Sequence, residues 1–256
     1  MTESFGDVTV SSDGDGVGVG LVEMRRPPAN YFDAALLGGI VAAVGRANEL
    51  GCRAIVLCSE GRHFCAGLDF GASRTPTPEG LGELYGRAVE LMGGPLPIVV
   101  AVQGAAIGGG LGLAMVGDFR VASDASRFEA NFARLGFHQG FGLSVTLPRA
   151  VGHQRASELL TTGRRVDGGE ALAIGLCDRL ADDPRAGAYA LAAEIAESAP
   201  LAVRSIRSTL RAGLTEQFAD ALGHERTEQL RLMRTDDFRE GIDASLHRRA
   251  PRFTGR

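Results

Sequence analysis

The 256-residue sequence contains no lysine, so arginine supplies all 27 of its cationic side chains. Schiff-base chemistry, pyridoxal chemistry and a Walker-type phosphate loop each require a lysine amine and are therefore excluded. Tryptophan is also absent. The formal net charge is only −4, and no cluster of basic residues stands out. We therefore expect neither nucleic acid nor an anionic membrane as a partner.

Cysteine is sparse and lacks the spacing of a metal site or of a redox pair. No C-x-x-C pair and no histidine at zinc-ligand spacing accompanies the four cysteines, which are Cys52, Cys58, Cys65 and Cys177. We expect buried thiols, no metal site, and a reducing, cytoplasmic environment. The first residues show no basic segment followed by an apolar one, so no signal peptide is expected.

One long apolar run, residues 96–117, contains Gln103 as its single strongly polar side chain. The run is long enough to cross a bilayer as a helix. Residues 108–110 in its middle are all glycine, and each would cost a helix about 1 kcal/mol relative to alanine. The run therefore predicts a buried strand, a glycine loop and a buried helix, with no membrane span.

Hydrophobic periodicity predicts mixed strands and helices up to residue 200 and helices beyond it. Expected strands are residues 8–10, 17–24, 54–58, 97–102, 119–122 and 126–131, the first two joined by a glycine-aspartate turn over 11–16. Expected helices are residues 33–50, 79–92, 111–116, 155–160, 168–174, 186–198, 201–214 and 216–234. This order predicts an α/β body over residues 1–200 and a helical C-terminal region over residues 201–256.

Two segments, residues 62–69 and 103–118, each lead from a buried strand into a glycine-containing turn. In the second, the glycines open a helix whose first N–H groups lack partners and whose dipole is positive at that end. Glycine also lets a ligand approach the backbone closely. The turn therefore suits an anionic oxygen, although close packing of helix on strand would explain the glycines as well. No lysine or serine accompanies it, which argues against a phosphate-binding loop.

The two segments and their spacing resemble the enoyl-CoA hydratase/isomerase (crotonase) superfamily. Further matching segments are Arg26-Pro27-Pro28-Ala29-Asn30, residues 117–122, residues 147–152, and residues 163–176, which resemble the pattern G-x-x-x-x-A-x-E-A-x-x-x-G-L. The ordered set of motifs covers nearly the whole chain. The resemblance implies an α/β fold with a crotonase-like ββα spiral core and a helical C-terminal region that packs in a homotrimer or hexamer.

The resemblance also implies a chemistry. Members of the family bind acyl-CoA thioesters and stabilise an enolate with two backbone N–H groups, which here are those of Leu68 and Gly109. The segment Ala66–Phe70, including Gly67 and Asp69, is implied to hold coenzyme A together with Arg26 and Ala29, although Arg26 is equally typical of a solvated surface charge. Coenzyme A would be part of the substrate, and no permanently bound cofactor is expected.

The sequence departs from the family pattern where hydratases carry their two glutamates. The first position is Gly112 and the second is Phe132, and the aspartate of dienoyl-type isomerases falls on Gly140. Hydration needs one group to activate water and another to deliver the proton, and each contributes about 10²–10⁴-fold to the rate. We therefore expect an enzyme that is not an efficient 2-enoyl-CoA hydratase, with isomerisation, C–C cleavage, decarboxylation and thioester hydrolysis all open.

Other side chains are candidates for the missing roles. His138 lies in a glycine-flanked loop beside these positions and would act as a base near neutral pH, although a histidine satisfied by backbone or water is the more ordinary explanation. An apolar or ring-bearing acyl group is suggested by phenylalanines around the expected pocket: Phe132, Phe137 and Phe141. Structural roles are more typical for Glu129, Asp69 and Asp118, the last two capping or orienting the glycine loops. Three residues of the 79–92 helix are weaker candidates for acyl contacts: Glu83, Tyr85 and Glu90.

Two other functions stay open beside that of an enzyme acting on acyl-CoA. One is a non-catalytic acyl-CoA binding protein that kept the pocket and lost the carboxylates. The other is a C–C bond hydrolase of the same fold that acts on β-diketones without coenzyme A.

Overall fold

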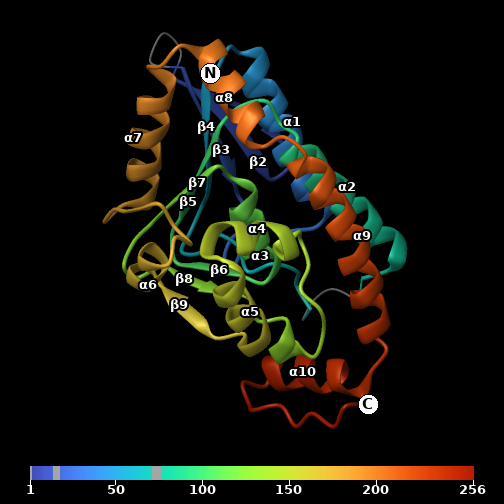
Figure 1. The fold of residues 1–256 in the computed structure, drawn as a ribbon. Coiled ribbons are helices and arrows are strands. Elements are labelled where there is room, and N and C mark those ends of the chain that lie inside the picture. Colours follow the sequence, from blue (N-terminus) through green and yellow to red (C-terminus); the bar gives the residue numbers. More distant parts are fainter. Residues whose placement is uncertain (1, 14–17, 71–75) are drawn as a thin grey trace.

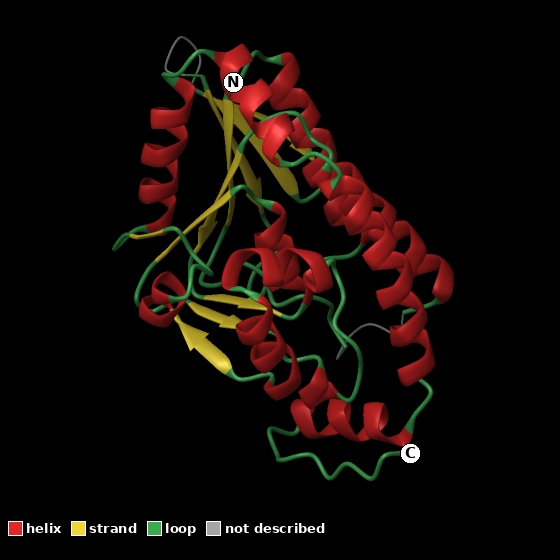
Figure 2. Ribbon diagram, in the orientation of Figure 1, coloured by secondary structure: helices red, strands yellow, loops and turns green. Residues whose placement is uncertain are grey.

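The computed structural model describes residues 2–13, 18–70 and 76–256. The fold contains two β-sheets with helices around them, as Figures 1 and 2 show. The turn expected near residues 14–16 lies outside the described residues. The sequence-based assignment of an α/β fold is confirmed.

A seven-stranded sheet forms the larger layer, in the order β1-β2-β3-β4-β5-β7-β10. The first three strands pair antiparallel, and from β3 to β10 each neighbour is parallel. The strands are β1 (Thr2–Phe5), β2 (Val8–Ser12), β3 (Val19–Met24), β4 (Ala54–Ser59), β5 (Ile98–Val102), β7 (Phe119–Ala122) and β10 (Arg179–Leu180). Every residue of β4 and β5 is buried, as expected for parallel strands with both faces covered.

A second, three-stranded sheet contains β6 (Ala105–Ile107), β8 (Arg127–Glu129) and β9 (Arg165–Asp167). The chain alternates between the sheets, because β5 and β7 belong to the large sheet whereas β6 and β8, which directly follow them, belong to the small one. This alternation is the ββα pattern that the family resemblance implies. It splits the apolar run of residues 96–117 into β5, β6 and α3 (Gly109–Val116).

Helices cover both faces of the large sheet (Figure 1). One face packs against α1 (Ala34–Glu49), and α2 (Pro78–Met92) lies beside that helix, while the other face packs against α7 (Pro184–Ala196). Asp33 caps α1 by accepting a hydrogen bond from the Leu36 amide at 2.8 Å, as the sequence predicted. The remaining elements before residue 200 are a 3₁₀ turn (Ala133–Leu135), α4 (Leu143–Val151), α5 (His153–Thr162) and α6 (Gly168–Ala173).

Three helices form the C-terminal region: α8 (Pro200–Leu210), α9 (Leu214–Leu232) and α10 (Asp236–Leu246). None of the residues of α8 is buried. In contrast, α9 runs beside α2 and buries Phe218 and Leu222, and α10 packs Phe238 against the aromatic core. Helix α8 begins at the expected position, and the division into two regions at residue 200 stays a prediction. No helix in the described part of the chain is long and apolar enough to cross a membrane.

Candidate active site

A cavity of about 250 Å³ lies between the start of α3, helix α2, the segment that follows β8, and the two last helices. The wall is mainly apolar, and among the described lining residues Asp69 carries the only carboxylate. Residues that line it are Tyr31, Phe32, Ala66, Gly67, Leu68, Asp69, Phe70, Leu84, Tyr85, Ile107, Gly108, Gly109, Asn131, Phe132, Leu135, Phe137, Gly140, Phe141, Gln229, Ile242, Ser245 and Leu246. The structure thus brings both glycine segments to one cavity.

The two glycine turns touch at this cavity. Gly67 has a φ of +79°, and a Cβ added to it would lie 3.2 Å from the Gly109 nitrogen and 3.0 Å from the Ile107 carbonyl oxygen. A backbone bridge between Cys65 and Ala106 holds the two segments in this register. Glycine at position 67 therefore permits both the left-handed backbone and the close approach of the two turns.

The amides of Leu68 and Gly109 belong to these touching turns. Gly109 is the first residue of α3, so its N–H has no partner within the helix. Among the described residues, no backbone carbonyl accepts a hydrogen bond from either amide. The ring of Phe32 lies directly over Gly109, since a Cβ at that position would come 2.5 Å from its Cζ atom. The ring of Phe32 therefore leaves no space for a side chain at position 109.

Several phenylalanine rings lie together at the cavity. The ring of Phe137 contacts those of Phe70, Phe132 and Phe238, with centroid distances of 5.7, 5.4 and 5.3 Å. Phe70 and Phe238 come from opposite ends of the sequence and lie 6.0 Å apart at nearly perpendicular planes. Such edge-to-face pairs are favourable beyond the area they bury. The cluster gives the cavity an apolar end whose shape is set by rigid rings.

Position 112 does not face the cavity, which corrects its expected place in the acyl pocket. Gly112 is buried under Phe141, and a Cβ there would overlap the Cβ of Phe141 and lie 3.0 Å from its ring. Phe141 reaches this place with a φ of +59°, a backbone conformation that costs a residue with a large side chain. The space that a hydratase glutamate would need is thus filled by an aromatic ring.

Positions 132 and 140 line the cavity, and neither carries an acid. Phe132 fills its position with a ring that is 5% exposed. A Cβ at Gly140 would overlap the hydroxyl of Tyr85 and the Nε2 atom of Gln229. Apolar or paired atoms therefore lie at all three positions where the family resemblance implies carboxylates in related enzymes.

Helices α2 and α9 hold the loop that carries Phe141. The Tyr85 hydroxyl donates to Gln229 Oε1 at 2.7 Å, and Gln229 Nε2 donates to the His138 carbonyl oxygen at 3.1 Å. One turn earlier on α9, the buried carboxylate of Glu225 accepts from the amides of Gly142 and Ser144 at 2.8 and 2.9 Å. Burial raises the pKa of Glu225, while these hydrogen bonds oppose the rise. The loop is fixed from two sides by groups distant in sequence.

His138 does not line the cavity, which contradicts its expected role as a base. Its Nδ1 atom lies 2.8 Å from the carbonyl oxygen of Gln139, and its ring packs edge-on against that of His224 at 5.7 Å. From this loop Phe137, Gly140 and Phe141 line the cavity. The backbone carbonyl of His138 instead accepts the hydrogen bond from Gln229 that helps to hold this loop.

The expected coenzyme A residues fall into two groups. Ala66, Gly67, Asp69 and Phe70 line the cavity, whereas Arg26 and Ala29 do not. Arg26 is paired with Asp7 and Asp33 at 2.8 and 3.0 Å, and the Ala29 carbonyl accepts from the Ala66 amide at 3.0 Å.

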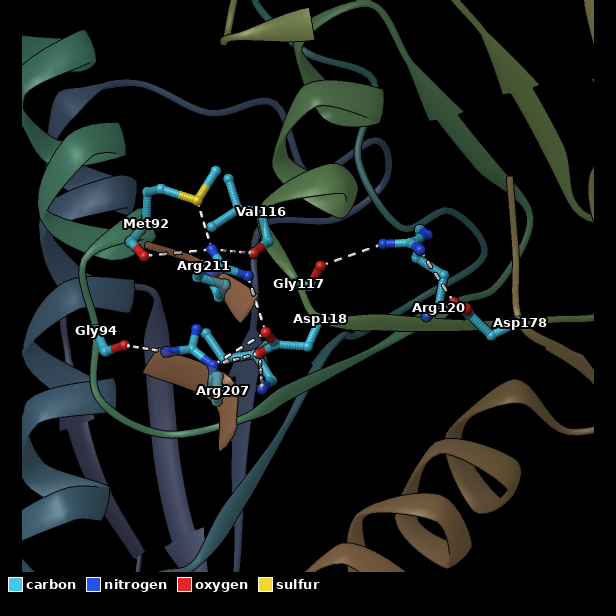
Figure 3. Close-up of polar contacts among 10 residues, drawn as sticks. Met92, Gly94, Val116, Gly117, Asp118, Arg120, Asp178, Arg207 and Arg211 are labelled. Atoms are coloured by element: carbon cyan, nitrogen blue, oxygen red, sulfur yellow. Dashed lines mark hydrogen bonds and ion pairs between the residues drawn. The ribbon is translucent and has the colours of Figure 1, made fainter. Parts of the chain in front are cut away.

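Asp118 does not contact the glycine loop that it was expected to orient. Its carboxylate accepts from Arg207 at 2.9 Å, from Arg211 at 2.8 Å, and from the Ile98 amide at 2.9 Å (Figure 3). Burial lowers the pKa of Arg211, as expected for a guanidinium removed from water. Asp118 therefore fastens the α8–α9 junction to the sheet. A structural role for Glu129 agrees with its ion pair to Arg165 at 3.4 Å.

Sequence reasoning missed several lining residues. Tyr31 takes part in the wall next to Phe32, and burial and the nearby Asp69 charge raise its pKa. The C-terminal contributions were also missed: Gln229, Ile242, Ser245 and Leu246. Gln229 could have been noticed in the sequence, because it is an amide within the apolar pattern of α9. The three residues of α10 could not, because that helix was not expected.

Comparison with known proteins agrees with this geometry. The family model described as enoyl-CoA hydratase/isomerase matches residues 14–256. A probable enoyl-CoA hydratase of Bacillus subtilis is 32% identical over 93% of this chain and 95% of its own. Cyclohexa-1,5-dienecarbonyl-CoA hydratase of Thauera aromatica is 33% identical over 100% of both chains.

Solved structures show the same fold. The crystal structure of an enoyl-CoA hydratase/isomerase from Pseudoalteromonas atlantica superposes with a TM-score of 0.84 at 29% identity, and covers 97% of this chain and 100% of the other. The family match extends over both glycine turns, the cavity and the three C-terminal helices. The chain is thus an enzyme of the enoyl-CoA hydratase/isomerase family, with the crotonase fold.

Proposed function

We propose that the protein binds an acyl-CoA thioester and stabilises its enolate in an oxyanion hole made by the amides of Leu68 and Gly109. The observation that supports this most strongly is the contact between the two glycine turns, where a Cβ on Gly67 would lie 3.2 Å from the Gly109 nitrogen. Both amides are left without acceptors among the described residues. Removal of one such donor typically costs about 2.7–4 kcal/mol of transition-state stabilisation.

The same cavity argues against efficient hydration of 2-enoyl-CoA. Phe141 covers Gly112, and the ring of Phe132 stands at the second glutamate position. Neither ring can activate water or deliver a proton. A reaction that rests chiefly on enolate stabilisation fits better, whether isomerisation, C–C cleavage, decarboxylation or thioester hydrolysis.

The phenylalanine end of the cavity suits an acyl group that bears an apolar ring. The rings of Phe70, Phe132 and Phe137, which line the cavity and pack against one another and against Phe238, offer flat walls to a ring. The printed name of the Thauera aromatica relative describes a cyclic substrate, cyclohexa-1,5-dienecarbonyl-CoA. The coenzyme A part of the substrate would lie along residues 66–70, with Arg26 and Ala29 at the outer end.

We also propose a homotrimer or hexamer. Helix α8 has no buried residue, and three of its large apolar side chains are exposed: Leu201 at 81%, Ile206 at 60% and Leu210 at 72%. An exposed apolar face of this kind is typical of an association surface.

Calorimetric titration separates the candidate functions. The proposal predicts that acyl-CoA binds more tightly than free coenzyme A, because free coenzyme A lacks the carbonyl that the two amides hold. Loss of the conjugated absorbance of crotonyl-CoA then measures hydration, with a family hydratase that carries both glutamates as the positive control. Binding with hydration at least about 10²-fold slower than in the control supports the proposal.

Hydration at the control's rate would contradict it. Acyl-CoA binding with no turnover of any thioester in a panel favours the non-catalytic binding protein. The absence of carboxylates at positions 112 and 132 agrees with that alternative. Absence of binding to any coenzyme A ester favours the C–C bond hydrolase.

A further inference from the structure

The carboxamide of Asn131 lies beside the residue that precedes the proposed oxyanion donor. Gly108 has a φ of +56°, and a Cβ added there would lie 3.0 Å from Asn131 Oδ1 and 3.9 Å from the ring of Phe132. Both Asn131 and Gly108 line the cavity. The amide is therefore placed close to Gly109, where the first carbons of a bound acyl group would lie.

The cavity wall contains two side-chain amides, those of Asn131 and Gln229. Among the described residues, only the Gln229 amide has hydrogen-bond partners. Gln229 is held by Tyr85 on one side and by the His138 carbonyl on the other. The Asn131 side chain makes no hydrogen bond with any described residue, although its backbone carbonyl accepts from Leu135 at 3.2 Å. Its amide thus keeps its two donors and its acceptor without described partners, at a residue that lines the cavity.

The surroundings make this open amide selective. Phe132 is almost fully buried at 5% exposure, and Asn131 itself is only partly exposed. A purely hydrocarbon acyl group would displace water from the amide without replacing its hydrogen bonds, which is unfavourable. An acyl group that carries an oxygen near the thioester would instead form a hydrogen bond with the amide and so replace the bond to water. Sites built to hydrogen-bond a substrate oxygen discriminate against analogues that lack it.

We propose that Asn131 is a specificity-determining residue that hydrogen-bonds an oxygen on the β-carbon of the acyl group, so that the favoured ligands are 3-oxoacyl or 3-hydroxyacyl thioesters of coenzyme A. This inference rests on the proposed binding of acyl-CoA at the same site. A carboxamide neither takes nor gives a proton at ordinary pH, so Asn131 orients this oxygen and does not act as the acid or base.

The test compares two coenzyme A esters of equal chain length, one 3-oxoacyl and one saturated, by calorimetric titration. In Asn131→Leu, which keeps the volume and removes the amide, affinity for the 3-oxo ester is expected to fall about 3- to 10-fold. Affinity for the saturated ester is expected to stay the same or to rise. Asn48→Leu makes the same change on α1, where Asn48 contacts Arg204, and should alter neither affinity.

Equal losses for both esters, or no loss for either, would overturn the inference. If Asn131→Leu does not fold, Asn131→Asp serves instead, because the new carboxylate should weaken the 3-oxo ester more than the saturated one. An equal effect of Asn131→Asp on both esters would likewise overturn it. If the unmodified protein binds neither ester, the proposed function itself has failed, and this result is distinct from a lost preference.

Discussion

The Cβ of Phe141 occupies the space directly against Gly112, the position at which the family resemblance implies the first glutamate of a hydratase. Phe141 is held there with a φ of +59° by a loop that Glu225 and Gln229 fasten from α9. Position 112 therefore lacks a glutamate, and the side chain of Phe141 also occupies the space that a glutamate there would need. Replacing one residue would not restore the hydratase arrangement.

Gly112→Ala is expected to destabilise the protein, because the added methyl group must displace the Phe141 ring. Overpacking of this kind typically costs about 1–3 kcal/mol. Gly45→Ala is the matched control, since Gly45 lies on α1 with nothing within 4 Å of an added Cβ. That change should stabilise the helix by about 0.5–1 kcal/mol. Urea denaturation measures both, and equal effects of the two substitutions would contradict this packing.

Gly67→Ala is expected to weaken the binding of acyl-CoA about 3- to 10-fold, as the loss of a hydrogen bond to the carbonyl would do. The new Cβ would strain a residue at φ +79° and crowd the Gly109 nitrogen at 3.2 Å. Free coenzyme A has no carbonyl at this place but would also lie along Gly67, so its affinity should fall less than that of acyl-CoA. Titration with both ligands gives the comparison, and an equal loss for free coenzyme A would argue against the oxyanion hole.

Asp118→Asn is expected to lower the free energy of unfolding by about 3 kcal/mol, as the loss of one partner from a buried ion pair does. The side chains of Asp118 and Arg207 are each only 12% exposed, and Arg211 is 15% exposed. Glu90→Gln is the control, because its pair with Arg87 is about half exposed and such pairs contribute about 0–1 kcal/mol. Losses of similar size in both variants, measured by chemical denaturation, would contradict the structural role of Asp118.

Glu240 should make stability depend on acidity. The Arg249 guanidinium, 2.6 Å away, and the Arg252 amide lower the pKa of Glu240 to about 2, below the 4.5 of an ordinary glutamate. The folded state therefore binds this proton less readily than the unfolded state, so the stabilisation is present above pH 4.5 and is lost as the pH falls toward 2. Stability curves of the protein and of Glu240→Gln should converge over this interval. Curves that stay parallel would contradict the ion pair.

Much of the fold could be predicted from local sequence patterns. The helix capped by Asp33 is confirmed, because capping and periodicity are both local signals. The strands β9 and β10 were missed, since segments of three and two residues are too short to show alternation. Helix α10 was missed although Thr235 caps it by accepting from the Phe238 amide at 3.1 Å.

Part of the site could be predicted from the sequence. Both glycine turns line one cavity together with Phe132, Phe137 and Phe141, and the role of the two amides stays a prediction. His138 does not line the cavity, because nearness in sequence does not set the direction of a side chain. Gln229 was missed because its place in the cavity depends on how α9 packs across α2, a contact that no local pattern encodes.

The central claim is that the amides of Leu68 and Gly109 bind one carbonyl oxygen. A crystal structure of the protein with a non-hydrolysable acyl-CoA analogue that keeps the carbonyl tests this most directly. We predict that its oxygen lies about 2.7–3.1 Å from both nitrogens, with the acyl group among Phe70, Phe132 and Phe137. A carbonyl that points away from either nitrogen in a fully occupied complex would contradict the account.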